Sequence, residues 1–487
     1  MPSPEPSAEH ERLLPEPAGE SRAESEVPRE LDQGPTWQRF IHVLTVGIAV
    51  YVSFTLAGAF MSVSSNQLIQ GAACQQLYPD VREPYADERC NSDSVQSRLS
   101  LIVGWELTFS LMPGMIMAVP YGILMDRVGV RLFSAVLFVA SAVAQALEFI
   151  VCLSPETFDL RLIWLAPWVN LIGGGAVVWH GISYTICNSI ATDKNRVTIF
   201  FYKSVVSTLA EAASGPLVLV AMKRGPAFTQ TLGIALCAFS GILCLAFPRN
   251  LIRDKDVPGQ GKAQPTHTLR QPLTLLKTAA LNAKKVFTEN VQIGALLVGL
   301  VFTTIGTFEG PIRLQYATKR YGWSWSEANL VISTTITINL ALMVVVIPAV
   351  SHWLLKWYSP LGKDLWMARA GVFALGAGCF ATGLAPTAAT FIAALALYRV
   401  EVMQSPAIMS ILTTLAKTGE SGSGHLNAVY QCVALASSVG ALVSGPLYAE
   451  AFRISLRLGE EWIGLPFYVG GCLQVVAVVI LFWIQEK

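Results

Sequence analysis

Long apolar stretches alternate with short polar segments along the 487 residues of the chain. A bilayer core about 30 Å thick is crossed by ~20 apolar residues in a helix. By this length the pattern predicts twelve spans, near residues 40–63, 98–122, 131–153, 161–187, 197–221, 228–248, 291–316, 326–350, 366–386, 388–415, 425–450 and 462–484. Backbone N–H and C=O groups find no water in hydrocarbon, so the spans are expected to be helices. The predicted fold class is an all-α membrane protein with twelve transmembrane helices in two six-helix halves.

Two polar segments divide the chain. Residues 1–38 form an acidic, proline-containing stretch that is expected to be a disordered cytoplasmic tail. Residues 249–290 form a linker between spans six and seven, in which lysine and arginine outnumber the acidic residues. The predicted organisation is therefore a tail, an N-terminal six-helix half over 39–248, the cytoplasmic linker, and a C-terminal six-helix half over 291–487.

Composition and charge narrow the class of protein. Only 14% of the residues are charged and the mean hydropathy is +0.50, whereas a soluble domain has about 25% charged residues. A net charge of +1 excludes a strongly basic nucleic-acid binder. The acidic start is unlike a cleaved signal peptide. Lysine and arginine are more frequent in the loops that lie with the linker, so both termini and the linker are expected to face the cytoplasm.

Cysteine and histidine spacing bears on redox and metal chemistry. Cys74 and Cys90 both lie in the first outward loop, where they form either a disulfide or two free thiols. The six histidines form no His box, and no metal-ligand spacing occurs. Without a nucleophile motif or a phosphate loop, we expect no metal, no cofactor and no enzyme activity.

A ten-residue motif lies at the inner junction of spans two and three. It reads Gly122-Ile-Leu-Met-Asp126-Arg127-Val-Gly129-Val-Arg131. This resembles the signature of the major facilitator superfamily between helices two and three, and the resemblance covers about residues 40–484. It implies the major facilitator fold and a gating role in which Asp126 braces helix two against helix eleven while the inside is closed. The alternative is that these are ordinary positive-inside loop charges.

Other marks of that family are partial. Gly215-Pro216 in span five resembles the Gly-Pro of the antiporter motif in drug exporters, and it also predicts a simple helix kink. The tract from Leu314 to Ser324 resembles fungal facilitators that export secondary metabolites or drugs. Span four lacks the family's arginine, which weakens the expectation of proton coupling through that position.

Ionisable side chains inside a span mark a pathway by default, since each costs about 2.5–3.5 kcal/mol to insert. The candidates are Glu106, Glu148, His180, Lys203, Glu211, Glu309, Arg313, Arg399 and Glu401. Glu148, Glu309 and Arg313 lie near predicted outer ends and Lys203 near an inner end, so these four are expected to reach water.

Glu211 and Arg399 lie nearest the midplane, where transporter sites are found. Arg399 could bind an anionic substrate or counter a carboxylate such as Glu211, which otherwise makes a structural pair between helices. Glu401 follows Arg399 by two residues and so is expected to have other partners. His180 could relay protons or could be a structural hydrogen-bonding residue.

These features together lead to three hypotheses about function. The first is a secondary transporter that moves a small organic molecule by alternating access, as proton-coupled efflux of a metabolite or drug. The second is uptake of a nutrient or organic anion, and the third is a transport-inactive sensor or scaffold. A monomer in the lipid bilayer is expected. The plasma membrane is the expected location, and an acidic dileucine pattern ending at Leu14 makes the vacuolar membrane the alternative.

Overall fold

The computed structural model describes residues 37–191, 196–249, 251, 291–418 and 423–484. Within the helices, the side chains of 118–120, 122–123, 126–127, 196–198, 416–418, 423–428 and 430–431 also lie outside the description. Most of the predicted tail and of the predicted linker is therefore not covered, and their boundaries stay predictions.

The described residues form helices and no strand, and twelve of the helical stretches are long and apolar enough to cross a membrane. The first six spans are α1 (Trp37–Leu77), α2 (Asp93–Val128), α3 (Val130–Leu153), η2 with α4 (Leu160–Leu171 and Gly175–Ile190), α5 (Arg196–Met222) and α6 (Pro226–Cys244). The last six are α8 with α9 (Val291–Thr307 and Gly310–Tyr321), α10 with η3 and α11 (Trp325–Ala341, Leu342–Val346 and Ile347–Leu354), α12 (Pro360–Leu384), α13 with η4 and α14 (Ala388–Tyr398, Arg399–Met403 and Gln404–Thr418), α15 (Ser423–Leu458) and α16 (Leu465–Trp483). Two short 3-10 turns, η1 (Glu88–Asn91) and η5 (Glu460–Trp462), precede α2 and α16. The predicted fold class is confirmed.

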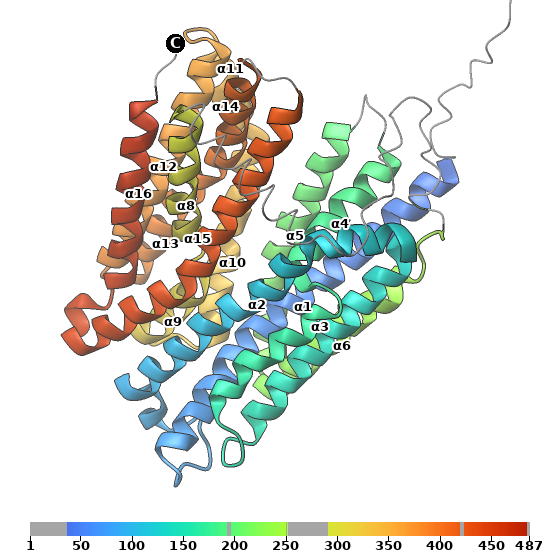
Figure 1. The fold of residues 1–487 in the computed structure, drawn as a ribbon. Coiled ribbons are helices and arrows are strands. Elements are labelled where there is room, and N and C mark those ends of the chain that lie inside the picture. The colour runs from blue at the N-terminus through green and yellow to red at the C-terminus, as the bar shows by residue number, and fades with distance from the viewer. Residues whose placement is uncertain (1–36, 192–195, 250, 252–290, 419–422, 485–487) are drawn as a thin grey trace, which may run out of the picture.

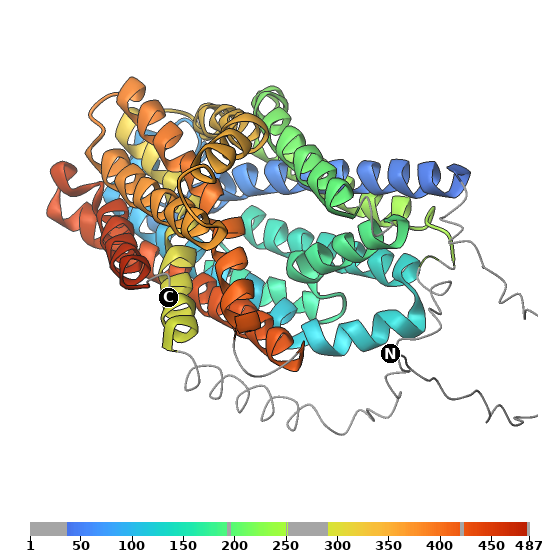
Figure 2. The same cartoon turned by 90° about the horizontal axis from the view of Figure 1, so that it is seen from above.

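The bundle has two ends that differ in their packing. We call inner the end at which α1 begins and α16 ends, and outer the end that carries the loop between α1 and α2. In Figure 1 the inner end is at the top, where the two halves stand apart, and they converge toward the bottom. Figure 2, seen from the inner end, places the second half on the left and most of the first half on the right.

Buried apolar side chains explain this shape. One cluster near the inner end belongs to the first half alone and includes Phe138, Trp179 and Phe247. A second belongs to the second half alone and includes Ala368 and Leu481. The largest cluster lies at the outer end and combines residues of both halves. Since apolar burial is the main favourable term in packing, the halves are held together chiefly at the outer end.

Helix α1 extends fourteen residues beyond the predicted end of span one, to Leu77. The extension is polar, yet Ser64, Asn66 and Gln70 are buried. Ser64 Oγ donates to Gln230 Oε1 of α6 at 2.6 Å, so the protein satisfies these groups instead of water. Apolar length alone therefore underestimates this helix.

Candidate functional site

The gating motif lies where α2 passes into α3. Gly129 ends one helix and starts the next with a φ of 85°, a left-handed conformation that favours glycine. Its N–H donates to the carbonyl oxygen of Met125. Arg131 lies in the first turn of α3 and is partly exposed. The side chains of Asp126 and Arg127 lie outside the described residues, and so does the burial of Gly122. The brace from Asp126 to helix eleven therefore stays a prediction.

Polar contacts join the two halves at the outer end. Trp325 Nε1 of α10 donates to Gln70 Oε1 of α1 at 2.6 Å. Gln315 Nε2 of α9 donates to both oxygens of Gln96, the backbone carbonyl and Oε1, each at 2.9 Å. All four side chains are buried. Because buried polar groups are costly unless paired, separation of the halves here would leave several donors and acceptors to be rehydrated.

A disulfide in the first outer loop supports one of these contacts. Cys74 and Cys90 are bonded, which confirms the disulfide alternative. Gln70 Nε2 donates to the carbonyl oxygen of Cys90 at 3.0 Å and to Asn91 Oδ1 at 2.8 Å. The loop closed by the disulfide thus orients the glutamine that binds Trp325 of the other half.

The segment around the disulfide also carries exposed charges. Lys319 Nζ of α9 lies 2.8 Å from Asp93 Oδ1 at the start of α2, a further contact between the halves. Arg89 bonds to both Asp80 and Asp87. Hydrogen bonds from Arg89 hold the pKa of both carboxyl groups below the ordinary aspartate value. The loop acids therefore stay ionised, and keep their partners, at neutral and mildly acidic pH.

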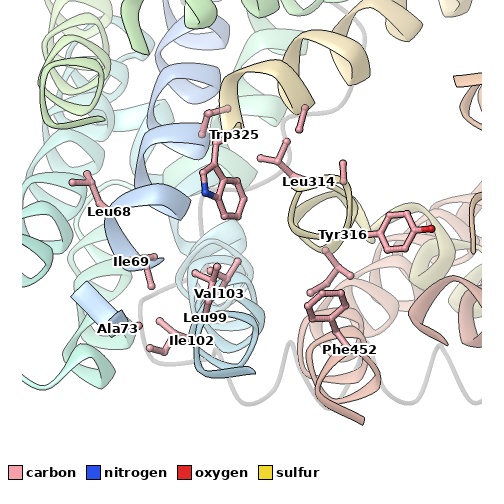
Figure 3. Close-up of a cluster of buried hydrophobic side chains, with 14 of the residues drawn as sticks. Leu68, Ile69, Ala73, Leu99, Ile102, Val103, Leu314, Tyr316, Trp325 and Phe452 are labelled. Atoms are coloured by element: carbon pink, nitrogen blue, oxygen red, sulfur yellow. The ribbon is translucent and has the colours of Figure 1, made fainter. Parts of the chain in front are cut away.

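Apolar and backbone contacts complete the closure. Figure 3 shows Trp325 placed between Leu68 and Ile69 of α1 on one side and Leu314 of α9 on the other, with Phe452 of α15 beyond. Helices α2 and α15 touch through glycine. A Cβ on Gly104 would come within 2.6 Å of the carbonyl oxygen of Gly445. Only backbones without side chains allow this approach. We call these polar, apolar and glycine contacts the outer closure.

Two spans of the second half are interrupted at similar depth. Span seven breaks between α8 and α9, where the ring of Pro311 would clash with the carbonyl of Thr307 in a continuous helix. Span ten tightens into the 3-10 turn η4, just before Pro406 removes another backbone donor. Tyr398 Oη donates to the carbonyl oxygen of Gly306 at 3.2 Å and so ties the two breaks together.

A buried charge cluster occupies these breaks. Arg313 Nη2 lies 2.6 Å from Glu309 Oε1, and the side chains are 5% and 0% exposed. The Arg313 guanidinium lies over the ring of Tyr398, 4.1 Å from its centroid. Cys379 Sγ of α12 donates to Glu309 Oε2 at 3.7 Å. The expectation that Glu309 and Arg313 reach water is wrong, because α9 extends the span to Tyr321 and the second half encloses both side chains.

Unpartnered atoms surround that ion pair. Among the described residues, buried Arg313 Nε, Glu401 Oε2 and Tyr448 Oη have no hydrogen-bond partner. Glu401 interacts electrostatically with Arg313. An ion pair with spare donors and acceptors in a dry site can be rearranged by one proton or one polar ligand.

Arg399 points to a different set of partners. Its Nε and Nη2 donate to Thr335 Oγ1 of α10 at 3.3 Å, and Nη2 also donates to the carbonyl oxygen of Ile332 at 3.4 Å. Helix α10 packs on α5 of the first half. Glu211 lies on α5, exposed, and its charge interacts with that of Arg399, although the described structure records no ion pair between them.

Gly215 lies one turn beyond Glu211 at the contact of α5 with α10. A Cβ at this position would come within 2.9 Å of Ser333 Cβ, so the absence of a side chain permits the approach. Helix α5 continues through Pro216 to Met222. The kink at Gly215-Pro216 stays a prediction, but Gly215 has a packing role that the motif resemblance did not suggest.

His180 lies apart from that group, nearer the inner end. It is exposed on α4, close enough to Lys203 of α5 for their charges to interact. The Lys203 ammonium lies 3.7 Å from the ring centroid of Tyr184 and 5.1 Å from that of Tyr51. Two aromatic faces therefore contact the Lys203 ammonium, while its side chain stays only partly buried, and the expectation that it reaches water stays a prediction.

The first half also contains a buried acid. Glu148 of α3 is 2% exposed, so the expectation that it reaches water is wrong as well. Its carboxylate accepts hydrogen bonds from Ser65 Oγ and, at 3.1 Å, from Gln145 Nε2. Glu106 on α2 lies near enough for the two charges to interact. Sequence reasoning missed this cluster because its members come from three different helices.

No group of three or more potential metal ligands occurs among the residues that the structure describes. The predicted site residues fall into two groups instead. Glu211, Arg399 and Glu401 lie around α10 and the break in span ten, whereas His180 lies with Lys203. The buried Glu309–Arg313 pair is the main addition, and its spacing of four residues, typical of helical ion pairs, is the signal in the sequence.

Comparison with known proteins gives full-length relatives. No family profile matches the chain. It is 28% identical over 440 residues to the MFS efflux pump atnC of Emericella nidulans, covering 86% of this chain and 84% of that protein. It is 22% identical over 439 residues to the MFS-type transporter avaK of Aspergillus versicolor, covering 88% of this chain and 90% of that one.

A solved structure gives the same picture of the fold. The nucleoside transporter NupG superposes with a TM-score of 0.60 at 13% identity. The match covers 92% of this chain and 100% of that chain. At this identity the likeness concerns the arrangement of helices alone.

Proposed function

This chain belongs to the major facilitator superfamily, and on that premise we propose that it is a secondary active transporter that exports a small organic molecule by alternating access, driven by proton movement. Efflux is supported by the name of the relative atnC, an efflux pump. The chain acts as a monomer in the plasma membrane or the vacuolar membrane, with its inner end toward the cytoplasm. The disulfide at the outer end agrees with this orientation, because disulfides persist outside the reducing cytosol.

The outer closure is the observation that carries the proposal. It joins two halves whose inner clusters are separate, so the contacts that hold the halves together lie at one end. In alternating access, such contacts break while contacts at the opposite end form. The gating motif around Asp126 lies at that opposite end, where the resemblance implies a brace used when the inside is closed.

Proton coupling is supported by the carboxylates within the spans. Glu309 and Glu401 lie at interrupted helices and share one arginine, Arg313. If one of these acids is protonated, Arg313 can turn to the carboxylate of the other. The ion pair then moves without leaving an additional uncompensated charge in the interior. Glu211 faces the same region from the first half. Interrupted helices near the midplane are where coupling ions and substrates bind in such transporters.

The test locks the outer closure. Asp93→Cys and Lys319→Cys replace an exposed ion pair that joins the halves, and a short bifunctional maleimide links the two thiols. In vesicles that contain the purified protein, we expect the link to abolish proton-dependent flux, while each single variant treated with the same reagent keeps it. Flux that continues in fully linked protein would contradict alternating access at this interface. Absence of any flux in the unlinked protein would favour the sensor or scaffold instead.

A further inference from the structure

We propose that the transported molecule is an organic anion, a compound with a carboxylate, sulfate or phosphate group on an apolar body. The inference rests on the proposed export function and names its substrate class. It is carried by cations without carboxylate partners at three levels along the bundle. Lys203 lies toward the inner end, Arg399 in the middle, and Arg98 with Arg161 at the outer end.

Lys203 is the innermost of these cations. It lies about 18 Å nearer the inner end than Gly215, at ~1.5 Å of helix rise per residue. Its ammonium contacts the rings of Tyr184 and Tyr51, and no carboxylate pairs with it among the described residues. A cation over an aromatic face keeps its charge without a counterion. Lys203 is also only partly buried, so this charge remains accessible to a ligand.

Arg399 holds the middle position. Every acceptor recorded for its guanidinium is neutral, the hydroxyl of Thr335 and the carbonyl of Ile332. A guanidinium has five N–H donors and binds carboxylates or phosphates in a two-pronged geometry. The nearby acids interact with it only at longer range, and Arg313 is already paired with Glu309. An anionic ligand is the partner that Arg399 lacks.

A cavity of about 420 Å³ lies at the outer end. Both halves contribute to it, since its lining includes Arg98 of α2, Arg161 of η2 and Arg453 of α15. Arg98 donates to the neutral Gln76 Oε1 at 2.6 Å, and the Arg161 side chain has no recorded partner within the described residues. Arg453 is paired with Glu450 at 2.6 Å.

The rest of the cavity lining completes an amphipathic surface. Leu101 and Ile102 supply an apolar wall beside the guanidinium groups, and Asp159 is the acidic residue in the lining. The cavity therefore offers an anionic group two unpaired cations next to an apolar surface, at the end from which an exported molecule would leave.

Two of the interior acids already have partners within the protein. Glu309 is paired with Arg313, and Glu148 accepts hydrogen bonds from Ser65 and Gln145. Glu211 is an exposed acid on α5, and its carboxylate interacts electrostatically with the guanidinium of Arg399. Arg399 remains a buried guanidinium whose hydrogen-bond acceptors among the described residues are all neutral, which favours a ligand of opposite charge.

The test identifies the exported compounds by their charge. In the organism that encodes the chain, the gene is deleted and then restored, and culture medium from both strains is separated by anion exchange before mass spectrometry. We expect compounds that are negatively charged at neutral pH to be depleted from the medium of the deletion strain. Depletion of neutral or cationic compounds alone would overturn the anion inference and leave export intact. No difference between the strains, in the medium or in isolated vacuoles, would overturn the export function itself.

Substitutions of Lys203 and Arg399 then test whether export of these anions depends on the two cations. Lys203→Gln and Arg399→Gln should each lower export of the depleted anions about ten- to hundredfold, the range expected for loss of a charged hydrogen bond. Lys203→Arg and Arg399→Lys should restore most of it, since both keep the charge. Lys223→Gln, an exposed lysine just after α5, is the matched control. Equal export by the charge-removing variants and the control, at equal amounts of protein in the membrane, would overturn the assignment.

Discussion

The Glu309–Arg313 pair shows what a single buried interaction does in this protein. Both side chains are almost fully enclosed, so neither can turn to water if its partner is lost. An intact buried pair adds little net stability, because desolvation offsets the attraction, but breaking one leaves an uncompensated charge. The pair therefore makes the fold sensitive to the protonation of one carboxylate.

Removal of the acid alone should be strongly destabilising. Glu309→Gln removes the carboxylate that contacts Arg313 and leaves only the more distant Glu401 to compensate its charge, so the expected cost is up to about 3–5 kcal/mol of unfolding free energy. Glu450→Gln removes the partner of Arg453, whose pair is half exposed, and should cost only about 0–1 kcal/mol. Thermal unfolding of both variants in the same detergent measures the difference.

A double variant separates charge from shape in this experiment. Glu309→Gln with Arg313→Met removes both charges and should recover much of the stability that Glu309→Gln loses. If Glu309→Gln and Glu450→Gln lose equal stability, or if the double variant is the least stable of the three, the buried charge of Arg313 does not explain the loss of stability.

Residue roles could be predicted from the sequence only where the signal was local. The Cys74–Cys90 bond is confirmed, although Cys74 lies in α1 and not in the outer loop as expected; the two cysteines are only 16 residues apart in the sequence, which makes a contact between them a local one. The predictions for Glu148, Glu309 and Arg313 are wrong, because distance along the chain to a predicted span end does not tell how other helices cover a side chain. The aromatic contacts of Lys203 come from two other helices and had no local signal.

At the scale of elements, proline decides where spans seven and ten are interrupted. Pro311 and Pro406 each follow the interrupted turn by a few residues. Both prolines are visible in the sequence, so the breaks were open to prediction from the clash that proline makes with the preceding turn. That the two breaks meet through Tyr398 depends on tertiary packing, and no sequence pattern indicated it.

Glycine sets the distance between α2 and α15. In Gly445→Ala the added Cβ would fall against the backbone oxygen of Gly104, which cannot move aside as a side chain can. The helices must separate, and the expected cost is about 1–3 kcal/mol, with a lower yield of the Asp93→Cys to Lys319→Cys link. Cross-linking yield at a fixed reagent concentration measures the separation.

Gly58→Ala provides the control for that substitution. Gly58 is also a glycine within a helix, but a Cβ there meets nothing within 4 Å. It should leave both stability and cross-linking unchanged or slightly improved, since alanine favours helix. An equal loss in the two variants would mean that helix propensity, and not the contact of α2 with α15, explains the effect.

At the scale of the molecule, the disulfide and the outer closure form one unit. The bond holds the loop whose backbone orients Gln70, and Gln70 binds Trp325 of the other half. The order of twelve spans and their arrangement in two halves followed from hydropathy, because a bilayer admits few alternatives to helices. Which end is closed could not be predicted, because it depends on contacts between residues more than two hundred positions apart.

Loss of the disulfide should loosen the closure. Cys74→Ala with Cys90→Ala avoids new buried polar groups and should lower stability by about 2–4 kcal/mol, as expected for opening a loop of this size. The yield of the Asp93→Cys to Lys319→Cys link should fall with it, because the segment held by the bond orients Gln70, which binds Trp325 of the other half. Cys472→Ala, which removes an exposed free cysteine, should change neither quantity. An unchanged link in the double variant would show that the closure does not depend on the disulfide.

Because the two halves pack together at the outer end, the apparent affinity for a ligand should differ between the two sides of the molecule. A ligand binds a protein with an apparent affinity reduced by the fraction of molecules whose site it can enter. With the outer end held shut by buried contacts, a molecule on the inner side meets a site that is already accessible. From outside, a population of about 1% open to that side would weaken binding about a hundredfold with no change in any contact. The closure would then keep an exported compound from returning even where it accumulates.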